Sequence, residues 1–302
     1  MNKNNKKPKV SITRDERHEA GKAQMISYIE SQYIGWHYVA IESIKKIILN
    51  SEEFYSDFNE SQPNSDLFTS KMVNVEIYNA WLYEALSHAE QAIEDLFSIM
   101  KKAQNPDWFA RDVVVYNATE IKKYIWDFIY HNDCAYVCKQ FQLPDLKKSS
   151  WKDESEHEKY KNSVNTVVEY IIELAEFHQS YYFDYCQYKH GLAVMLRDGG
   201  KNNKDPLNGV LKSYDSRSIE DGYKGMKNIP AIAMKVYPET AKCISELERE
   251  GNFLHYTPKQ ADIDNFLDIT GKAYSLLYVF RKNLMYSCEN EDDKRMRKYA
   301  FP

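Results

Sequence analysis

The chain has 302 residues, of which 43% are hydrophobic and 28% are charged, and its formal net charge is −5. This length and apolar content can bury a sizeable core, and the negative balance argues against a broadly basic surface for nucleic acid. No run approaches the roughly 18 consecutive apolar residues of a membrane span, and five scattered cysteines do not suggest a disulfide framework. We therefore expect a cytoplasmic protein with no membrane segment and with reduced thiols.

The low counts of 10 glycines and 9 prolines favour long helices. Residues 1–11 are basic and lack an apolar stretch, which predicts a flexible arm rather than a secretory signal. Apolar residues at helical spacing predict helix over 12–50, with a kink or break at Gly35. The composition of 51–69 is typical of a loop. Apolar residues three and four apart then predict an amphipathic helix over 70–102.

Further helices are predicted in the middle of the chain. One spans 107–141 and is stopped by the proline that follows Leu143. A charged segment, 145–162, leads into another helix that extends from Val164 to about Arg197. There an Asp-Gly-Gly sequence ends it.

The pattern changes after this point, because residues 198–237 contain five of the ten glycines and alternate briefly in the manner of a strand at 232–236. We expect a small hairpin or irregular cap there. Helix is predicted again at 239–250 and from Pro258 to about Ser287, because proline suits a first helical turn. The predicted fold is all-α: an antiparallel helical bundle in one domain, 12–302, with a small β or irregular insertion at 198–237.

Three residues have a spacing that metal ligands could use. His131, Cys134 and Cys138 would share one stripe if the predicted helix is continuous, and Cys186 could supply a fourth ligand to zinc. Cysteine is also among the most frequently buried residue types, so the alternative is that these side chains pack in the core. Structural zinc sites usually form on tight turns, and we therefore expect no metal and no cofactor.

A second stripe contains ionisable residues four apart on the helix predicted over 70–102. It departs from the Glu-x-x-His spacing of carboxylate-bridged metal bundles and lies opposite the apolar side, which favours a solvated face. The sequence lacks the motifs of phosphate-binding loops, dinucleotide-binding folds, α/β-hydrolases and common zinc proteases. The stripe comprises Glu84, His88, Gln91 and Asp95, and merges with Glu90 and Glu94.

The tetrapeptide Tyr188-Lys189-His190-Gly191 lies near the end of the predicted helix from Val164. A helical projection places Lys189 in the centre of the apolar stripe and His178 on the same stripe, so both should be at least partly buried. Gly191 would allow a backbone or ligand to approach closely. These residues are candidates for a ligand site; the alternative is a helix end with a snorkelling lysine and a core histidine.

The stretch 182–194, YFDYCQYKHGLAV, resembles the Y-K-H-G helix of bacterial α-helical proteins that we associate with the HEPN (higher eukaryotes and prokaryotes nucleotide-binding) superfamily. The resemblance implies a dimerising four- or five-helix bundle. Many members are metal-independent ribonucleases with an R-x4–6-H motif. In this chain the positions that would hold the arginine before His190 are 183–185, occupied by Phe, Asp and Tyr. Arg249 precedes His255 at the permitted spacing.

The resemblance leads to three hypotheses about function. The first is a non-enzymatic or degenerate HEPN-like homodimer that binds RNA or a nucleotide in a bacterial defence or toxin–antitoxin setting. The second is a metal-independent ribonuclease that uses Lys189 with His190, or Arg249 with His255. The third is a structural bundle that binds other proteins. The ligand-binding candidates are Tyr188, Lys189, His190, Gly191 and His178.

Overall fold

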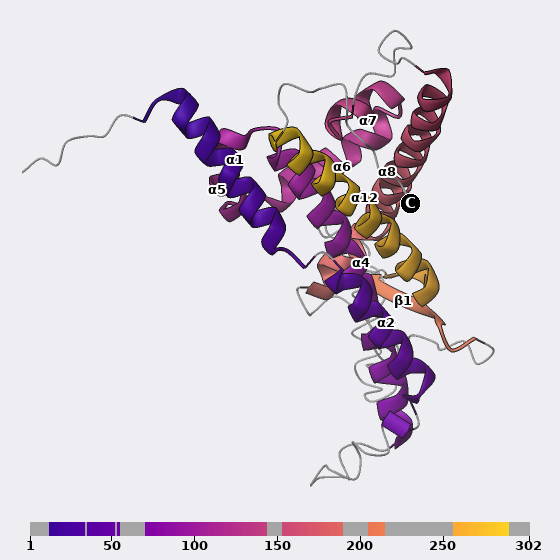
Figure 1. Cartoon of the computed structure of the whole chain (residues 1–302). Coiled ribbons are helices and arrows are strands. Elements are labelled where there is room, and N and C mark those ends of the chain that lie inside the picture. Colours follow the sequence, from indigo (N-terminus) through magenta and orange to yellow (C-terminus); the bar gives the residue numbers. More distant parts are fainter. Residues whose placement is uncertain are drawn as a thin grey trace, which may run out of the picture. The chain divides into compact units, whose positions relative to one another are not determined.

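The computed structural model describes residues 12–33, 35–51, 53–54, 70–143, 153–189, 205–214 and 256–289. Most of these residues are helical, and they include one small two-stranded sheet, which confirms the predicted all-α class (Figure 1). The elements are α1 (Arg14–Ser31), α2 (Trp36–Leu49), α4 (Ser70–Lys102), the 3₁₀ turn η2 (Pro106–Trp108), α5 (Phe109–Val114), α6 (Ala118–Tyr130), α7 (Cys134–Gln140), α8 (Glu154–Lys189), β1 (Asn208–Tyr214), β2 (Tyr256–Asp262) and α12 (Ile263–Glu289).

The N-terminal helices follow the predicted pattern. Gly35 occupies the N-cap of α2, which confirms the break between α1 and α2. Before α1, the Thr13 hydroxyl accepts a hydrogen bond from the backbone N–H of Glu16, and the Glu16 carboxylate accepts one from the backbone N–H of Thr13. This capping box fixes where α1 begins. The backbone N–H and the hydroxyl of Thr13 both donate to the Glu16 carboxylate, which lowers the pKa of Glu16.

The prediction of one continuous helix over 107–141 is wrong, because the segment forms η2, α5, α6 and α7. Two side chains start new helices inside it. The amide oxygen of Asn117 accepts from the backbone N–H of Glu120, and the Asp133 carboxylate accepts from that of Tyr136 at 2.7 Å. Asn and Asp are strong N-cap residues and compete with continued helix, so the chain turns at both positions.

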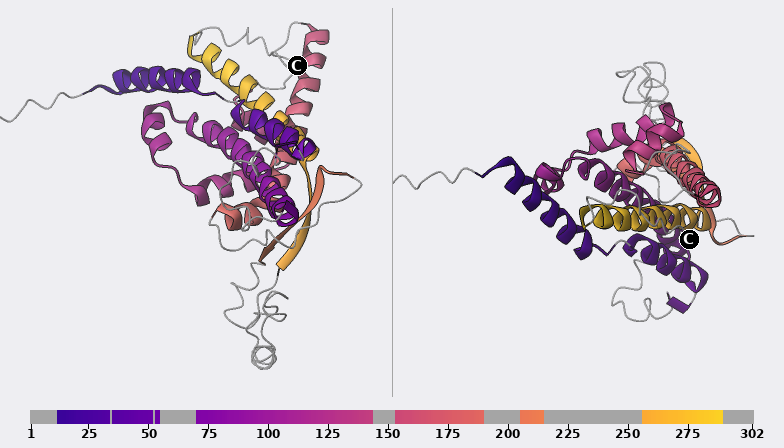
Figure 2. Two further views of the ribbon diagram at one scale, coloured as in Figure 1. Left: turned by 90° about the horizontal axis from the view of Figure 1, so that it is seen from below. Right: turned by 45° about the horizontal axis from the view of Figure 1, so that its top comes forward.

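The predicted helix start at Pro258 is also wrong. Pro258 lies inside β2, which pairs antiparallel with β1 and places Pro258 opposite Lys212. A proline is tolerated in a two-stranded sheet where its nitrogen faces away from the partner strand. The second strand then continues directly into α12 (Figure 2). The predicted strand pattern at 232–236, the helix at 239–250 and the arm at 1–11 lie outside the described residues.

The contacts divide the chain into two compact units, so the prediction of a single domain stays a prediction. Unit 1 comprises 1–34, 94–175 and 274–302, and unit 2 comprises 35–93 and 176–273. The core of unit 1 contains edge-to-face aromatic pairs, which add to the energy of apolar burial. These pairs are Phe97–Phe128 at 5.1 Å, Phe141–Phe280 at 5.2 Å and Tyr28–Phe109 at 5.5 Å.

In unit 2 the two-stranded sheet of β1 and β2 packs on α4 and α8. A side chain at Gly209 would overlap Leu82 and Tyr78 of α4, so the glycine lets β1 approach α4 closely. On the other strand, Lys259 forms an ion pair with the buried carboxylate of Asp184 on α8. Within the described ranges, no helix is long and apolar enough to cross a membrane.

Two helical glycines, Gly21 and Gly271, provide a matched test of how closely α1 packs on η2. A Cβ at Gly21 of α1 would collide with the backbone carbonyl of Pro106, whereas a Cβ at Gly271 of α12 would lie 3.6 Å from the ring of Tyr38. We expect Gly21→Ala to lower the free energy of unfolding by about 2 kcal/mol, because backbone cannot move aside cheaply. Gly271→Ala should raise it by up to about 1 kcal/mol through helix propensity. Urea unfolding checks both, and equal effects would contradict the packing of α1 on η2.

Candidate functional site

The described residues include three of the predicted site residues, Tyr188, Lys189 and His178. His190, Gly191, Arg249 and His255 lie outside the described residues, so their roles stay predictions. All three described residues belong to α8, and the structure gives each of them a different environment.

His178 is buried, as predicted. Its side chain and that of Glu90 on α4 are both fully inaccessible, and His178 Nε2 lies 3.8 Å from Glu90 Oε2. The imidazole also stacks on the ring of Tyr182 with centroids 4.7 Å apart. Removing a carboxylate from water is costly unless a cation or donors compensate it. His178 therefore faces Glu90 inside the core, and no solvent reaches either group.

The prediction that Lys189 is at least partly buried is wrong, because the residue is exposed. It is the last residue of α8. The long side chain reaches back along its own helix, and Lys189 Nζ donates to the Tyr185 hydroxyl at 3.3 Å. The ammonium also lies 5.4 Å from the centre of the Tyr185 ring, a cation–π arrangement.

Tyr188 is hydrogen-bonded to a group of polar side chains that lie far apart in the sequence. Its hydroxyl donates to Glu84 Oε2 of α4 at 2.8 Å. The other oxygen, Glu84 Oε1, lies 3.8 Å from His88 Nε2 one turn further along α4. His88 Nδ1 is hydrogen-bonded to His37 Nδ1 of α2 at 2.9 Å. With Trp36, which neighbours His37 and contacts the His88 ring, these residues form what we call the Glu84 cluster: Trp36, His37, Glu84, His88 and Tyr188.

Buried neighbours hold the Tyr188 ring in place. Tyr188 stacks on Tyr83 of α4 with centroids 5.2 Å apart and planes 13° apart. Tyr83 is 1% exposed, and its hydroxyl is hydrogen-bonded to the hydroxyl of Ser213 on β1 at 3.1 Å. Burial, together with the hydrogen bond to Glu84, raises the pKa of Tyr188, so the phenol stays protonated at neutral pH. The Glu84 carboxylate is therefore positioned by a donor that is itself locked by packing.

The hydrogen bond between the two imidazoles restricts their protonation. One Nδ1 must donate and the other must accept, so the pair cannot carry two charges while this bond exists. Burial, and secondarily the proximity of His37, lowers the pKa of His88, and the nearby Glu84 carboxylate offsets part of this effect. His88 is consequently neutral at pH 7, and the cluster offers hydrogen-bond donors and acceptors rather than net positive charge.

Trp36 forms an exposed aromatic surface beside these polar groups. Its side chain is 55% exposed at the first turn of α2, and its ring meets that of His88 edge-on at 6.4 Å. A large indole that stays accessible beside partly buried hydrogen-bonding groups offers a flat stacking surface next to polar recognition groups. This combination is the feature of the described residues with the clearest capacity to bind a ligand.

The stripe predicted as a solvated face contains two residues of this cluster. Glu84 and His88 remain partly accessible, but Glu90 is fully buried and Glu94 is 8% exposed. The assumption that failed was that α4 has one apolar side. The buried tyrosines, leucines and alanines of α4 lie around most of the circumference of the helix, which is the pattern of a helix covered on nearly every side.

No metal site accompanies the cluster in the part of the chain that the structure describes, because no three histidine, cysteine or carboxylate groups there could hold a metal ion. His131, Cys134 and Cys138 do not lie on one helical stripe, because a turn separates His131 from the helix that contains the two cysteines. His131 is the C-cap of α6, and Cys134 begins α7 after a turn. Cys138 is 6% exposed.

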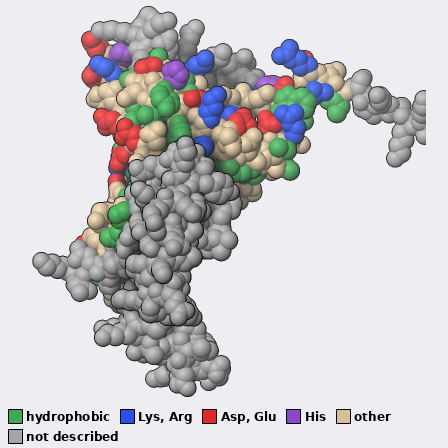
Figure 3. Space-filling model, turned by 180° about the vertical axis from the view of Figure 1, so that it is seen from behind, with side chains coloured by type: hydrophobic (Ala, Val, Ile, Leu, Met, Phe, Trp, Pro, Cys, Tyr) green, Lys and Arg blue, Asp and Glu red, His purple; other side chains and the backbone are tan. Residues whose placement is uncertain are grey.

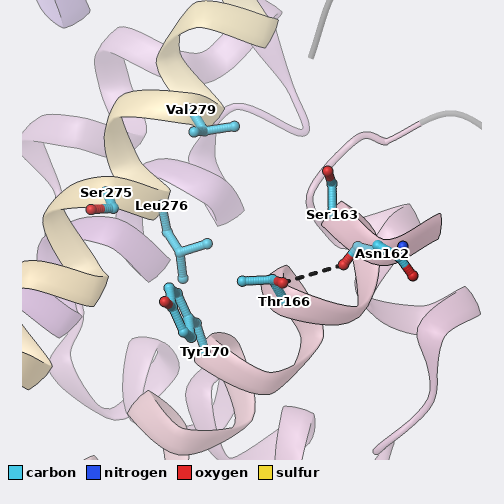
Figure 4. Close-up of a pocket in the computed structure, with 7 residues that line it drawn as sticks. All are labelled: Asn162, Ser163, Thr166, Tyr170, Ser275, Leu276 and Val279. Carbon is cyan, nitrogen blue, oxygen red and sulfur yellow. Dashed lines mark hydrogen bonds between the residues drawn. The ribbon is translucent and has the colours of Figure 1, made fainter. Parts of the chain in front are cut away.

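A small pocket in unit 1 offers less chemistry than the cluster. It encloses about 210 Å³ between α8 and α12 (Figure 4). The hydroxyls of Ser163 and Thr166 face it, but they donate to the backbone carbonyls of Lys159 and Asn162 within their own helix. Tyr170 is its single ionisable residue. The pocket therefore lacks charged groups that could recognise or transform a ligand.

The charged side chains do not form one dominant patch on the face shown in Figure 3. Acidic and basic groups of the described residues are interspersed there.

Comparison with family models, with curated proteins and with solved structures finds no match for this chain. Any functional conclusion thus depends on the chemistry of the residues themselves.

The lowered pKa of His88 predicts how stability depends on pH. As the pH falls through about 6.5, the unfolded chain takes up a proton at His88 before the folded chain does, so folding stability decreases. His88→Gln should reduce this decrease between pH 7.5 and 5.5, by at most about 1.4 kcal/mol per pH unit. Urea unfolding over this range measures the slope, with His157→Gln on α8 as the control. Parallel curves for wild type and His88→Gln would show that His88 is not held neutral.

Proposed function

We propose that this chain is a HEPN-like helical protein that binds RNA or a nucleotide at the Glu84 cluster without cleaving it. The observation that carries the proposal is the exposed ring of Trp36 beside the hydrogen-bonded imidazoles of His37 and His88. Proteins recognise single-stranded RNA by stacking its bases on aromatic rings and hydrogen-bonding their edges. The cluster supplies both kinds of group on one surface.

The polar groups of the cluster are suited to reading a base rather than a phosphate. Glu84 offers carboxylate oxygens that accept from base N–H groups, and it is 42% exposed. The imidazoles of His37 and His88 offer ring nitrogens that donate or accept. Lys189 directly follows Tyr188 and is exposed, so its ammonium is available for a phosphate oxygen. Recognition would thus combine stacking on Trp36 with hydrogen bonds to the base edge.

The same geometry favours binding over catalysis. Metal-independent cleavage of RNA needs a base and an acid on the two sides of a phosphodiester. His37 Nδ1 and His88 Nδ1 are only 2.9 Å apart, which leaves no space for a phosphate between these atoms. His88 is also a poor acid at neutral pH because its pKa is lowered. The ribonuclease hypothesis remains the second candidate, since two imidazoles in contact can share and exchange one proton.

Fluorescence anisotropy with a short labelled single-stranded RNA tests the proposal. We expect Trp36→Ala to weaken binding about tenfold, because stacking contributes about 1–3 kcal/mol for each base. Tyr130→Ala on α6 is the matched control, because it removes an aromatic side chain that is 73% exposed and lies outside the cluster. Binding that is lost equally in both variants, or in neither, would contradict the assignment to the Glu84 cluster.

A gel assay of the same RNA separates the alternatives. We expect intact RNA after incubation with wild-type protein. Cleavage that disappears in the double variant Lys189→Gln/His190→Gln would instead support the ribonuclease hypothesis and the sequence-predicted residues. If wild-type protein binds neither RNA nor nucleotides, the proposal fails and a protein-binding bundle becomes the better description.

A further inference from the structure

A second pocket in unit 1 has a different chemistry from the Glu84 cluster. It encloses about 480 Å³, a volume typical of small-molecule sites. The end of α4, the short helix α5 and the first turn of α6 line it. Three cationic side chains face it, namely those of Lys101, Lys102 and Arg111.

Lys102 differs from the other two cations of the pocket in its partners among the described residues. Lys101 pairs with Glu120 at 2.6 Å, and Arg111 pairs with Asp112 at 2.8 Å. Among the described residues, no carboxylate lies within ion-pair distance of Lys102. Its ammonium instead lies over the ring of Tyr116, 5.5 Å from the centroid. Burial lowers the pKa of Lys102, although Asp112 and more distant carboxylates partly oppose the shift.

The surroundings of Lys102 would stabilise an anion that carries an apolar group. Arg111 stacks on Trp108 at 4.5 Å, which orients its guanidinium while leaving the group 61% exposed. The first turn of α6 adds the partial positive charge of a helix N-terminus. Val115 and the buried Ile121 give the pocket apolar wall area. An anionic ligand would supply Lys102 with the counter-ion that the described residues do not provide.

We propose that this pocket binds a phosphomonoester with an apolar or aromatic substituent, with Lys102 and Arg111 contacting the phosphate and Val115 and Ile121 contacting the substituent. A dianionic phosphate suits the site, because both guanidinium and ammonium groups bind phosphate oxygens strongly. Asp112 and Glu120 are partly accessible, so they can release their cations toward the ligand. This site is independent of the Glu84 cluster, whose residues all belong to unit 2.

The proposal predicts an unusual response to substitution of Lys102. Because its ammonium is partly desolvated without a direct ion pair, Lys102→Met should leave the melting temperature of the ligand-free protein unchanged or raise it, while the methylene contacts over Tyr116 are kept. A residue with a purely structural role would show a lower melting temperature. Lys122→Met is the matched control, since Lys122 also lies over an aromatic ring, that of Trp126 at 5.1 Å, but outside the pocket.

Isothermal titration calorimetry with inorganic phosphate and with phenyl phosphate tests the site. We expect both probes to bind wild type, phenyl phosphate more tightly than inorganic phosphate. Lys102→Met should weaken both by at least about tenfold, and Lys122→Met should bind like wild type. If Lys102→Met does not fold, Arg111→Gln decides with the same probes, and weaker binding is again the expected result.

Several results would overturn the proposal. These are the absence of binding by wild type, an unchanged affinity in Lys102→Met or in its substitute Arg111→Gln, and, where Lys102→Met folds, a melting temperature of its ligand-free form below that of Lys122→Met. Benzoate that binds as tightly as phenyl phosphate would overturn the assignment to a phosphomonoester.

Discussion

The burial of α4 from Tyr78 to Met100 is the constraint on which the described structure depends. Most residues of this part of the helix are buried, including Glu90 at 0% exposure and Glu94 at 8%. A helix surrounded in this way leaves one narrow line of accessible positions, and four of them are Glu84, His88, Gln91 and Asp95. The Glu84 cluster uses the first two of these four positions.

Burial of α4 also explains why a polar pair, Glu90 with His178, and stacked tyrosine rings lie near the Glu84 cluster. Glu90 cannot keep its hydration, and the arrangement that places it opposite His178 holds α8 against α4 in unit 2. Two turns later along α8, Tyr185 is buried and Tyr188 stacks on Tyr83. One oxygen of the Glu84 carboxylate thus accepts a hydrogen bond from a fixed hydroxyl. Such packing pre-organises the polar groups, which lowers the entropy lost when a ligand binds.

The two proposed sites differ in how they would recognise a ligand. The Glu84 cluster carries a neutral His88, a protonated Tyr188 and one carboxylate, so hydrogen bonding and stacking would dominate. The Lys102 pocket carries three cations and two carboxylates, so charge would dominate. A protein with a net charge of −5 can still bind phosphate if its cations are concentrated in a pocket, because local fields outweigh the average charge there.

Helical periodicity predicts an element correctly where residues close in the sequence determine its ends. The limits of α4 and the break at Gly35 followed from apolar spacing and turn residues. The turns before α6 and α7 are hard to predict, because the apolar spacing continues across them. Only the N-cap residues Asn117 and Asp133 mark where the new helices begin. The strand at Pro258 depends on pairing with a segment some 46 positions earlier in the register, which no local pattern indicates.

The site shows the same division between local and long-range information. Glu84 and His88 were recognisable as a pair because one helix spaces them four residues apart. Their partners lie 51 and 104 positions away, His37 from His88 and Tyr188 from Glu84, so only tertiary packing joins them. Lys189 was misplaced because a helical projection assumes that a neighbour covers the stripe up to the last turn.

Photo-crosslinking to RNA that contains 4-thiouridine, followed by mass spectrometry of the linked peptides, tests the central claim most directly. We expect the principal crosslinked peptide to contain Trp36 and His37, because a base stacked on Trp36 places its reactive sulfur against this segment. Crosslinks confined to the basic ends of the chain, at 1–11 or 294–298, or to residues of unit 1 would contradict it.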